Sequence, residues 1–153
     1  MSTFKSPRPI ASSAVVRKRM ENQRRRDTGP EVALRRELWR RGLRYRVDQA
    51  PLPTQRRRRA DLVFAGARVA VFVDGCFWHG CPEHGSMPKA NRSWWKAKIA
   101  ANRARDADTT KALEAEEWRA LRVWEHEDLP CAADRIELVV RTRMKWRSSS
   151  VER

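Results

Sequence analysis

The sequence predicts a single α/β domain in which a mixed β-sheet is flanked by helices. At 153 residues the chain is long enough for one domain with a sizeable core and too short for two. Its apolar patterns follow the order helix, strands, long helix, strand, helix. A three-residue turn at 65–67 indicates an antiparallel hairpin, and the long helix after it is a crossover, so a mixed sheet is favoured over a parallel one.

The N-terminal part of the chain is poor in large apolar side chains. Residues 1–15 mix Pro, Ser and Thr and are predicted to form a flexible tail. The domain is expected over 16–147, followed by a frayed tail at 148–153. Residues 16–26 are mostly basic with Met20 as the main apolar side chain, which is typical of a short helix ordered against DNA phosphates or of a solvated face.

The first core helix has a clear start and stop. Residues 27–31 combine cap-forming side chains, Pro30 near the first turn and an early acid. The helix is predicted to run to about residue 41, because Gly42 is well placed as its C-terminal stop. Its apolar stripe is predicted to consist of Leu34, Leu38 and Trp39.

Strand and helix patterns alternate along the rest of the chain. A short strand is predicted at 43–47, and residues 48–59, with two prolines and four consecutive arginines, are predicted to form a loop. Apolar runs at 60–64 and 68–74 predict the two strands of the hairpin. The remaining predictions are one long helix or two broken helices over about 91–118, a strand over 119–125 and a closing helix over 132–146.

Positive charge dominates the chain and is concentrated in its first part. Lys and Arg number 34 against 19 Asp and Glu, a formal net charge of +15. Residues 1–60 carry 18 of the basic and 5 of the acidic side chains. This charge favours a polyanionic partner, with nucleic acid as the first candidate. Because we find neither a run of about 18 apolar residues nor a signal pattern, we expect a cytoplasmic protein without membrane association.

Metal-ligating residues crowd the segment that follows the strand at 68–74. Cys76, Cys81 and His84 lie close together, and thiolate with imidazole is the ligand set of structural zinc. A fourth ligand is expected just past the strand at 119–125. His126 is preferred because the strand end fixes its direction, and Cys131 is the alternative. The competing interpretation is that these are unconnected loop residues.

Acids and a histidine lie near the ends of the predicted hairpin. Asp61 begins one strand and Asp74 ends its partner, so antiparallel pairing brings the two close together. Two aspartates and a backbone carbonyl form an oxygen-rich environment that Mg²⁺ prefers. Asp61 has an alternative role as a partner of the arginine run. His79, if it is not a metal ligand, is suited to proton transfer near neutral pH.

Tryptophan is abundant, with seven in the chain, and aromatic side chains flank the cysteines. Phe77 and Trp78 lie between the two cysteines, and Trp95 lies near the start of the following helix. Exposed aromatic rings beside positive charge can stack on bases or wedge between base steps. Packing in the core is instead predicted for Trp39, Trp118 and Trp124.

The string VFVDGCFWHGCP at 71–82, with the pattern D-T-x-P-E at 27–31 and VWE at 123–125, resembles the very short patch repair (Vsr) DNA mismatch endonucleases. The resemblance covers about residues 16–145. It implies a restriction-endonuclease-like fold and a Mg²⁺-dependent enzyme that nicks one strand 5′ of the thymine in a T:G mismatch, the product of 5-methylcytosine deamination. It also implies a bacterial, nucleoid-associated monomer on double-stranded DNA, linked in function to a cytosine-5 DNA methyltransferase.

The resemblance also assigns roles to single residues. Asp61 and the main-chain carbonyl of Val73 correspond to the Mg²⁺ ligands, and His79 to the general base that acts on water. Glu31 corresponds to a glutamate that supports the site. Asp74 stands where the best-known member has histidine, and its implied role is to hold a metal-bound water or to orient His79. The usual nuclease lysine is not evident after Asp74, which fits a histidine in its place.

DNA contacts and zinc ligands follow from the same resemblance. Phe77, Trp78 and Trp95 correspond to a wedge that intercalates beside the mismatch, and Met20 to the segment that enters from the other groove. The implied zinc ligands are Cys76, Cys81, His84 and His126, with Cys and His types exchanged in the last two relative to the best-known member. The alternative function is a zinc-stapled DNA-binding module without catalysis, which would not need both Asp61 and His79.

Overall fold

The computed structural model describes residues 7, 10, 14, 15, 18 and 27–151. Met20 and most of the predicted N-terminal tail and basic helix lie outside the described residues. Within the described part of the chain, the strands form one four-stranded sheet in the order β1-β2-β3-β4. The elements are α2 (Gly29–Arg40), β1 (Arg46–Gln49), β2 (Ala60–Phe64), β3 (Val69–Asp74), α3 (Arg92–Ala115), β4 (Arg119–Trp124) and α4 (Leu129–Val151).

The sheet is mixed, as the sequence predicts. β1 pairs with β2 and β2 with β3 in antiparallel fashion, whereas β3 and β4 are parallel and are connected through α3. Because β3 and β4 run in the same direction, their C-terminal ends meet at one edge of the sheet, where Asp74 pairs with Trp124. The segment with both buried cysteines leaves β3 at this edge.

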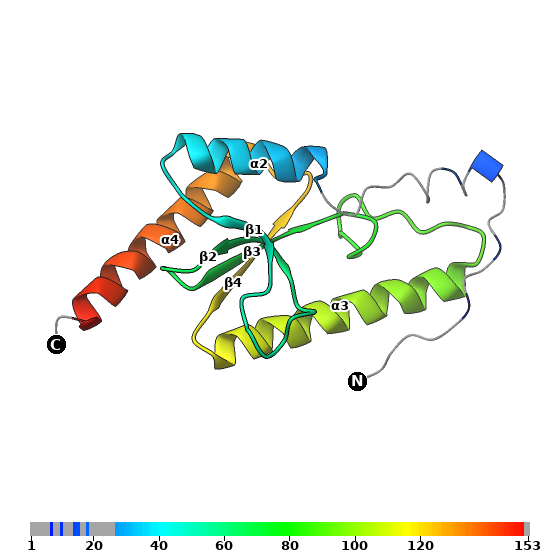
Figure 1. Ribbon diagram of the computed structural model, residues 1–153. Coiled ribbons are helices and arrows are strands. Elements are labelled where there is room, and N and C mark those ends of the chain that lie inside the picture. Colours follow the sequence, from blue (N-terminus) through cyan, green and yellow to red (C-terminus); the bar gives the residue numbers. More distant parts are fainter. Residues whose placement is uncertain (1–6, 8–9, 11–13, 16–17, 19–26, 152–153) are drawn as a thin grey trace.

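Helices cover both faces of the sheet (Figure 1). α2 and α4 pack on one face, where Leu38 and Ile136 are completely buried against Leu62 and Val71. α3 covers the other face, where Leu113 packs with Phe72 and Val63. Burial of each large aliphatic side chain contributes about 1.5–3 kcal/mol. None of the helices in the described part of the chain has the length and apolar character needed to cross a membrane.

Two elements start three residues away from their predicted positions. Leu43 was expected to begin a strand, but its N–H donates to the carbonyl of Leu38 and it follows Gly42, which has φ +83°. Leu43 therefore closes α2, and β1 starts three residues later. α4 starts at Leu129 because the Asp128 carboxylate accepts the N–H of Cys131 at 3.1 Å.

The C-terminal segment is also different from the prediction. α4 continues to Val151, so the residues from Ser148, expected as a frayed tail, extend the helix. The hydroxyls of Ser148, Ser149 and Ser150 each donate to the carbonyl four residues earlier. These bonds satisfy the serine side chains within the helix.

Trp39 is not a core residue, and that prediction is wrong. Its relative exposure is 51%, and the Arg44 guanidinium carbon lies 3.7 Å from the centre of its ring. Trp39 directly follows the buried Leu38, and one residue rotates the side chain by about 100° around a helix axis, away from the sheet. Trp118 is partly buried beside Leu113, and Trp124 is partly buried at the end of β4.

Candidate active site and Cys/His cluster

The candidate site is built at the sheet edge where β3 and β4 end. Residues 75–91, here called the Cys/His loop, lead from β3 to α3. Glu125 holds the start of this loop against β4, because its Oε1 accepts the N–H of Cys76 at 2.8 Å. The N–H of Glu125 in turn donates to the carbonyl of Asp74 at 3.0 Å. The position of the loop is thus fixed relative to both strands.

Asp61 on β2 is a largely buried carboxylate beside β3. Its Oδ2 accepts the N–H of Val73 at 2.7 Å. The pKa of Asp61 is raised to about 6, chiefly by burial and further by the negative charges of Glu31 and Asp74, which together outweigh the opposing effect of the Val73 N–H. A carboxylate with a raised pKa among other acids is a place where a divalent cation would relieve excess negative charge.

Glu31 contributes charge to this site from the first turn of α2. Its side chain is buried, and its Oε2 accepts the N–H of Asp27 at 2.8 Å and a hydrogen bond from Arg35 at 3.2 Å. Glu31 is therefore held by the start of its own helix. Its negative charge nevertheless contributes to the raised pKa of Asp61, so the structure brings these two predicted residues into one electrostatic environment.

His79 lies between two carboxylates. Its Nδ1–H donates to Asp106 Oδ2 at 2.5 Å, and its Nε2 lies 3.8 Å from Asp74 Oδ1. Burial alone would lower the pKa of His79, but the bond to Asp106 and the charges of both acids outweigh burial and raise this pKa. Asp74 is buried, which raises its own pKa, and it pairs with Arg122 at 2.9 Å.

Sequence reasoning missed Asp106 and Arg122. Asp106 lies on α3, 27 residues after His79, and is one acid among many charges on that helix. Only the packing of α3 against the sheet brings it to His79. Arg122 had a weak signal, since it is a charged residue between the buried Leu121 and Val123 in an otherwise apolar part of β4.

The four predicted zinc ligands lie together. One ligand atom each from Cys76, Cys81, His84 and His126 all lie within 4.8 Å of one another. The Nδ1 atom of His126 is 3.0 Å from the Cys76 sulfur and 3.7 Å from the Cys81 sulfur. These separations fit a tetrahedral zinc site, in which bonds of about 2.0–2.3 Å place neighbouring ligand atoms about 3.5 Å apart.

The chemistry of the cluster also fits a metal ion. Both cysteines are buried, and burial together with the neighbouring Cys81 raises the pKa of Cys76. A bound metal would favour the thiolate form and offset this burial. His126 Nε2 lies 3.5 Å from Glu83, a carboxylate able to orient the ring. Cys131 is exposed in the first turn of α4 and is not a member of this group.

The aromatic residues of the loop form one cluster with α3. Ring centroids of Phe77 lie 5.1 Å from both Trp78 and Trp95, with edge-to-face geometry. Trp95 is buried at the base of the cluster, although it was expected to be exposed, and the other two are partly buried. Asn102 donates to the Trp78 carbonyl at 2.9 Å, which ties the cluster to α3.

Gly80 allows this close approach of loop and helix. It has φ +63°, and a Cβ at this position would lie 2.8 Å from a methyl carbon of Ile99 on α3. A larger residue would therefore push the loop away from the helix. The turn that carries Trp78, His79 and Cys81 rests directly on α3 as a result.

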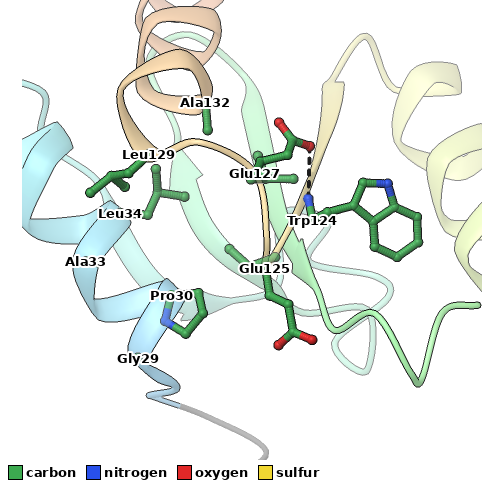
Figure 2. A pocket seen from close by; sticks show the side chains of 11 residues that line it. Gly29, Pro30, Ala33, Leu34, Trp124, Glu125, Glu127, Leu129 and Ala132 are labelled. Carbon is green, nitrogen blue, oxygen red and sulfur yellow. Dashed lines mark hydrogen bonds between the residues drawn. The ribbon is translucent and has the colours of Figure 1, made fainter. Parts of the chain in front are cut away.

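A cavity of about 240 Å³ adjoins the site on the side of α2 (Figure 2). It lies between Gly29 and Pro30 at the start of α2 and the turn that follows β4, and Val73 forms part of its wall. Glu127 Oε1 accepts the N–H of Trp124 at 3.0 Å, and Glu125 is bonded to the Cys/His loop. Both acids of the lining accept backbone N–H groups, and most of the other lining residues are apolar.

A mixed sheet whose edge carries the largely buried Asp61 and a histidine between two further acids is consistent with the restriction-endonuclease-like class of nucleases. Comparison with known proteins supports this class. The family model "DNA mismatch endonuclease Vsr" matches residues 10–83. The chain belongs to the Vsr family of DNA mismatch endonucleases, as the sequence motifs predicted.

Individual relatives place the chain within the same family. "Type II nicking enzyme V.NaeI" of Lentzea aerocolonigenes is 43% identical over 122 residues, which cover 79% of this chain and 74% of the relative. "Type II nicking enzyme V.XorIIP" of Xanthomonas oryzae pv. oryzae is 43% identical over 110 residues, covering 71% and 77%. "DNA mismatch endonuclease Vsr" of Escherichia coli (strain K12) is 36% identical over 104 residues, covering 65% and 62%.

Proposed function

We propose that this protein is a Mg²⁺-dependent endonuclease that nicks one DNA strand 5′ of the thymine in a T:G mismatch and so initiates very short patch repair. The observation that carries this proposal is the convergence of Asp61, Asp74 and the His79–Asp106 pair at one edge of the sheet in a Vsr-family chain. The relatives named as nicking enzymes support the reaction type. The net charge of +15 supports a nucleic-acid substrate.

Asp61 and the carbonyl of Val73 would hold the magnesium ion. When bound, Mg²⁺ polarises a phosphoryl oxygen and stabilises the charge that develops on it. Asp106 accepts the Nδ1–H of His79 and so leaves Nε2 as the atom that takes a proton from the attacking water. The imidazolium that results lies between Asp106 and Asp74, and both negative charges stabilise it.

The Cys/His loop would combine recognition with catalysis. Phe77 and Trp78, supported by Trp95, insert beside the mismatch, and unstacking costs about a few kcal/mol per step, which wider DNA contact offsets. Zinc on the four Cys and His ligands staples the loop to the end of β4. The wedge and His79 are neighbours in sequence, so this staple fixes their distance. Met20 is assigned to the opposite groove by family resemblance alone.

The biological setting follows from the substrate. A cytosine-5 methyltransferase creates the base whose deamination gives the mismatch, so we place the protein with such an enzyme in a bacterial cytoplasm, associated with the nucleoid. It acts as a monomer on double-stranded DNA. The alternative is a DNA-binding module without catalysis, and the His79–Asp106 pair favours the enzyme, because a binding module has no use for an oriented base.

The proposal is tested with an end-labelled T:G heteroduplex and a T:A duplex of the same sequence, each with and without Mg²⁺. We expect a single Mg²⁺-dependent nick 5′ of the mismatched thymine and none in the T:A duplex. Asp61→Ala serves as the inactive variant. Retained binding to mismatched DNA without a nick in any flanking context would favour the binding module instead.

Asp106→Asn is expected to slow nicking about 10- to 100-fold while duplex affinity changes less than about twofold. The amide keeps an oxygen that can accept the Nδ1–H of His79, but it lacks the charge that stabilises the imidazolium. The matched control is Asp108→Asn, on an exposed acid of the same helix that pairs with Arg58. Single-turnover rates and gel-shift affinities measure both effects, and equal rates for the two variants would contradict this role of Asp106.

A further inference from the structure

A second group of possible metal ligands lies inside the candidate active site. Single ligand atoms of Asp74, His79 and Asp106 lie within 4.8 Å of one another. Two carboxylates and an imidazole are a ligand set that suits divalent ions such as Mn²⁺. Two carboxylates this close also repel each other unless a positive charge lies near them. A nearby positive charge is therefore needed to offset this repulsion, and a side chain of the protein provides it.

That cation is the guanidinium of Arg122. Its Nη1 lies 2.9 Å from Asp74 Oδ1 and 3.5 Å from Asp106 Oδ1. Its Nη2 donates to the main-chain carbonyl of Asp106 at 3.4 Å. The guanidinium carbon lies 4.4 Å from the ring centre of Phe72, so the group also has a cation–π contact. One side chain thus bridges both acids that flank His79.

The fold places Arg122 at this point. β3 and β4 are parallel neighbours, and Arg122 pairs with Phe72 while Trp124 pairs with Asp74. Since side chains two residues apart share one face of a strand, Arg122 lies on the same face as Phe72 and Asp74. α3, which carries Asp106, covers this face. Arg122 is therefore fixed between an acid of the sheet and an acid of the helix.

We propose that Arg122 is the resident cation of the Asp74–His79–Asp106 group: it positions the two carboxylates around His79 and occupies the role of a divalent ion there. The inference rests on the proposed nicking activity for its catalytic consequence only. Arg122 acts through the acids and is a positioning residue. Arg122 places a positive charge beside Asp74. The residues that directly follow Asp74 in sequence include no lysine of the kind usual in nucleases.

The first test is nicking of the T:G heteroduplex by Arg122→Met and Arg122→Lys. We expect the methionine variant to lose about 30-fold in single-turnover rate with little change in duplex affinity, and the lysine variant to recover most of that loss. Arg119→Met, on an exposed arginine of the same strand, is the matched control and is expected to resemble wild type. Equal rates for Arg122→Met and Arg119→Met would overturn the positioning role.

A double variant tests whether Arg122 acts through Asp74. Asp74→Asn removes one of its two carboxylate partners, so Asp74→Asn/Arg122→Met is expected to be less impaired than the product of the two single losses. Strict multiplication of the two losses would contradict the coupling. Circular dichroism and Tm identify a variant that fails to fold, and Arg122→Gln then replaces the methionine variant in the same comparison.

The second test does not depend on nicking. Mn²⁺ binding to zinc-loaded protein is followed by the loss of the electron paramagnetic resonance signal of free Mn²⁺, in an Asp61→Asn background that removes the proposed magnesium site. In this background, we expect Arg122→Met to bind about one additional Mn²⁺ per chain and Arg122→Lys to bind none. Adding Asp106→Asn to Arg122→Met is expected to abolish the additional Mn²⁺ binding. No gain in Arg122→Met would overturn the inference, even if wild type nicks DNA. A wild type that fails to nick would instead remove the proposed function.

Discussion

Replacement of Asp61 by asparagine is expected to abolish nicking and at the same time to stabilise the protein at pH 7 without Mg²⁺. In the wild type, the N–H of Val73 lies 2.7 Å from the Asp61 carboxylate. Asparagine keeps an oxygen that can accept this N–H, but it has no charge to hold a divalent cation. We expect the single-turnover rate to fall at least about 1,000-fold, equivalent to about 4 kcal/mol of transition-state free energy. The free energy of unfolding in urea is expected to rise by about 1–3 kcal/mol.

The gain in the free energy of unfolding from Asp61→Asn increases with pH, because the pKa of Asp61 is higher in the folded protein than in the unfolded chain. Burial raises the pKa of Asp61 to about 6 in the folded protein, whereas an aspartate in an unfolded chain titrates near about 3.9. The charged carboxylate therefore destabilises the fold above pH 6, and this penalty fades as the pH falls through 6 toward 4. The advantage of Asp61→Asn is thus full at pH 7–8 and absent below about pH 4.

Controls separate the two effects of Asp61. Asp108→Asn changes an exposed acid and is expected to alter neither the nicking rate nor the pH dependence of stability to a comparable extent. Added Mg²⁺ should raise the Tm of wild type and not that of Asp61→Asn. A variant less stable than wild type at pH 7 would show that the carboxylate is not under strain from burial, and a variant that nicks within tenfold of wild type would exclude a metal-binding role.

Local patterns were sufficient for the parts of the site that are close in sequence. The turn at 65–67 predicted the hairpin of β2 and β3, and this pairing places Asp61 against Val73. The spacing of Cys76, Cys81 and His84 within one loop predicted their grouping, and the strand end that fixes His126 was visible as the end of an apolar run. Each of these inferences needs only a period or a short loop.

The residues that sequence reasoning missed depend on how α3 docks on the sheet. The carboxylate of Asp106 reaches His79 only because a 24-residue helix returns under the end of β3, and its position along that helix has no local signature. Arg122 becomes meaningful only once β4 is known to lie beside β3 with Phe72 as its register partner. The prediction that Trp39 is buried was wrong for a local reason. A residue next to an apolar stripe can point outward, because one step along the helix turns the side chain away from the core.

Loss of one cysteine from the Cys/His cluster is expected to remove the zinc ion and to destabilise the Cys/His loop. Cys76→Ser should reduce zinc from about one ion per chain to less than about half, and lower the free energy of unfolding by at least about 3 kcal/mol. The loop has few buried residues after Cys81, so the three ligands in its first part supply much of what holds it. Metal analysis by mass spectrometry and urea unfolding measure the two quantities.

Cys131→Ser is the matched control for this prediction, because Cys131 is the exposed cysteine outside the cluster. It should keep its zinc and its stability, whereas His126→Ala should lose zinc as Cys76→Ser does. The reverse pattern would make Cys131 the fourth ligand and contradict the 3.0 Å approach of His126 to the Cys76 sulfur. Phe77 and Trp78 lie between the two cysteine ligands, so a protein without zinc should also lose its preference for T:G over T:A duplex. Its general affinity for DNA should remain, because that affinity depends on the basic surface.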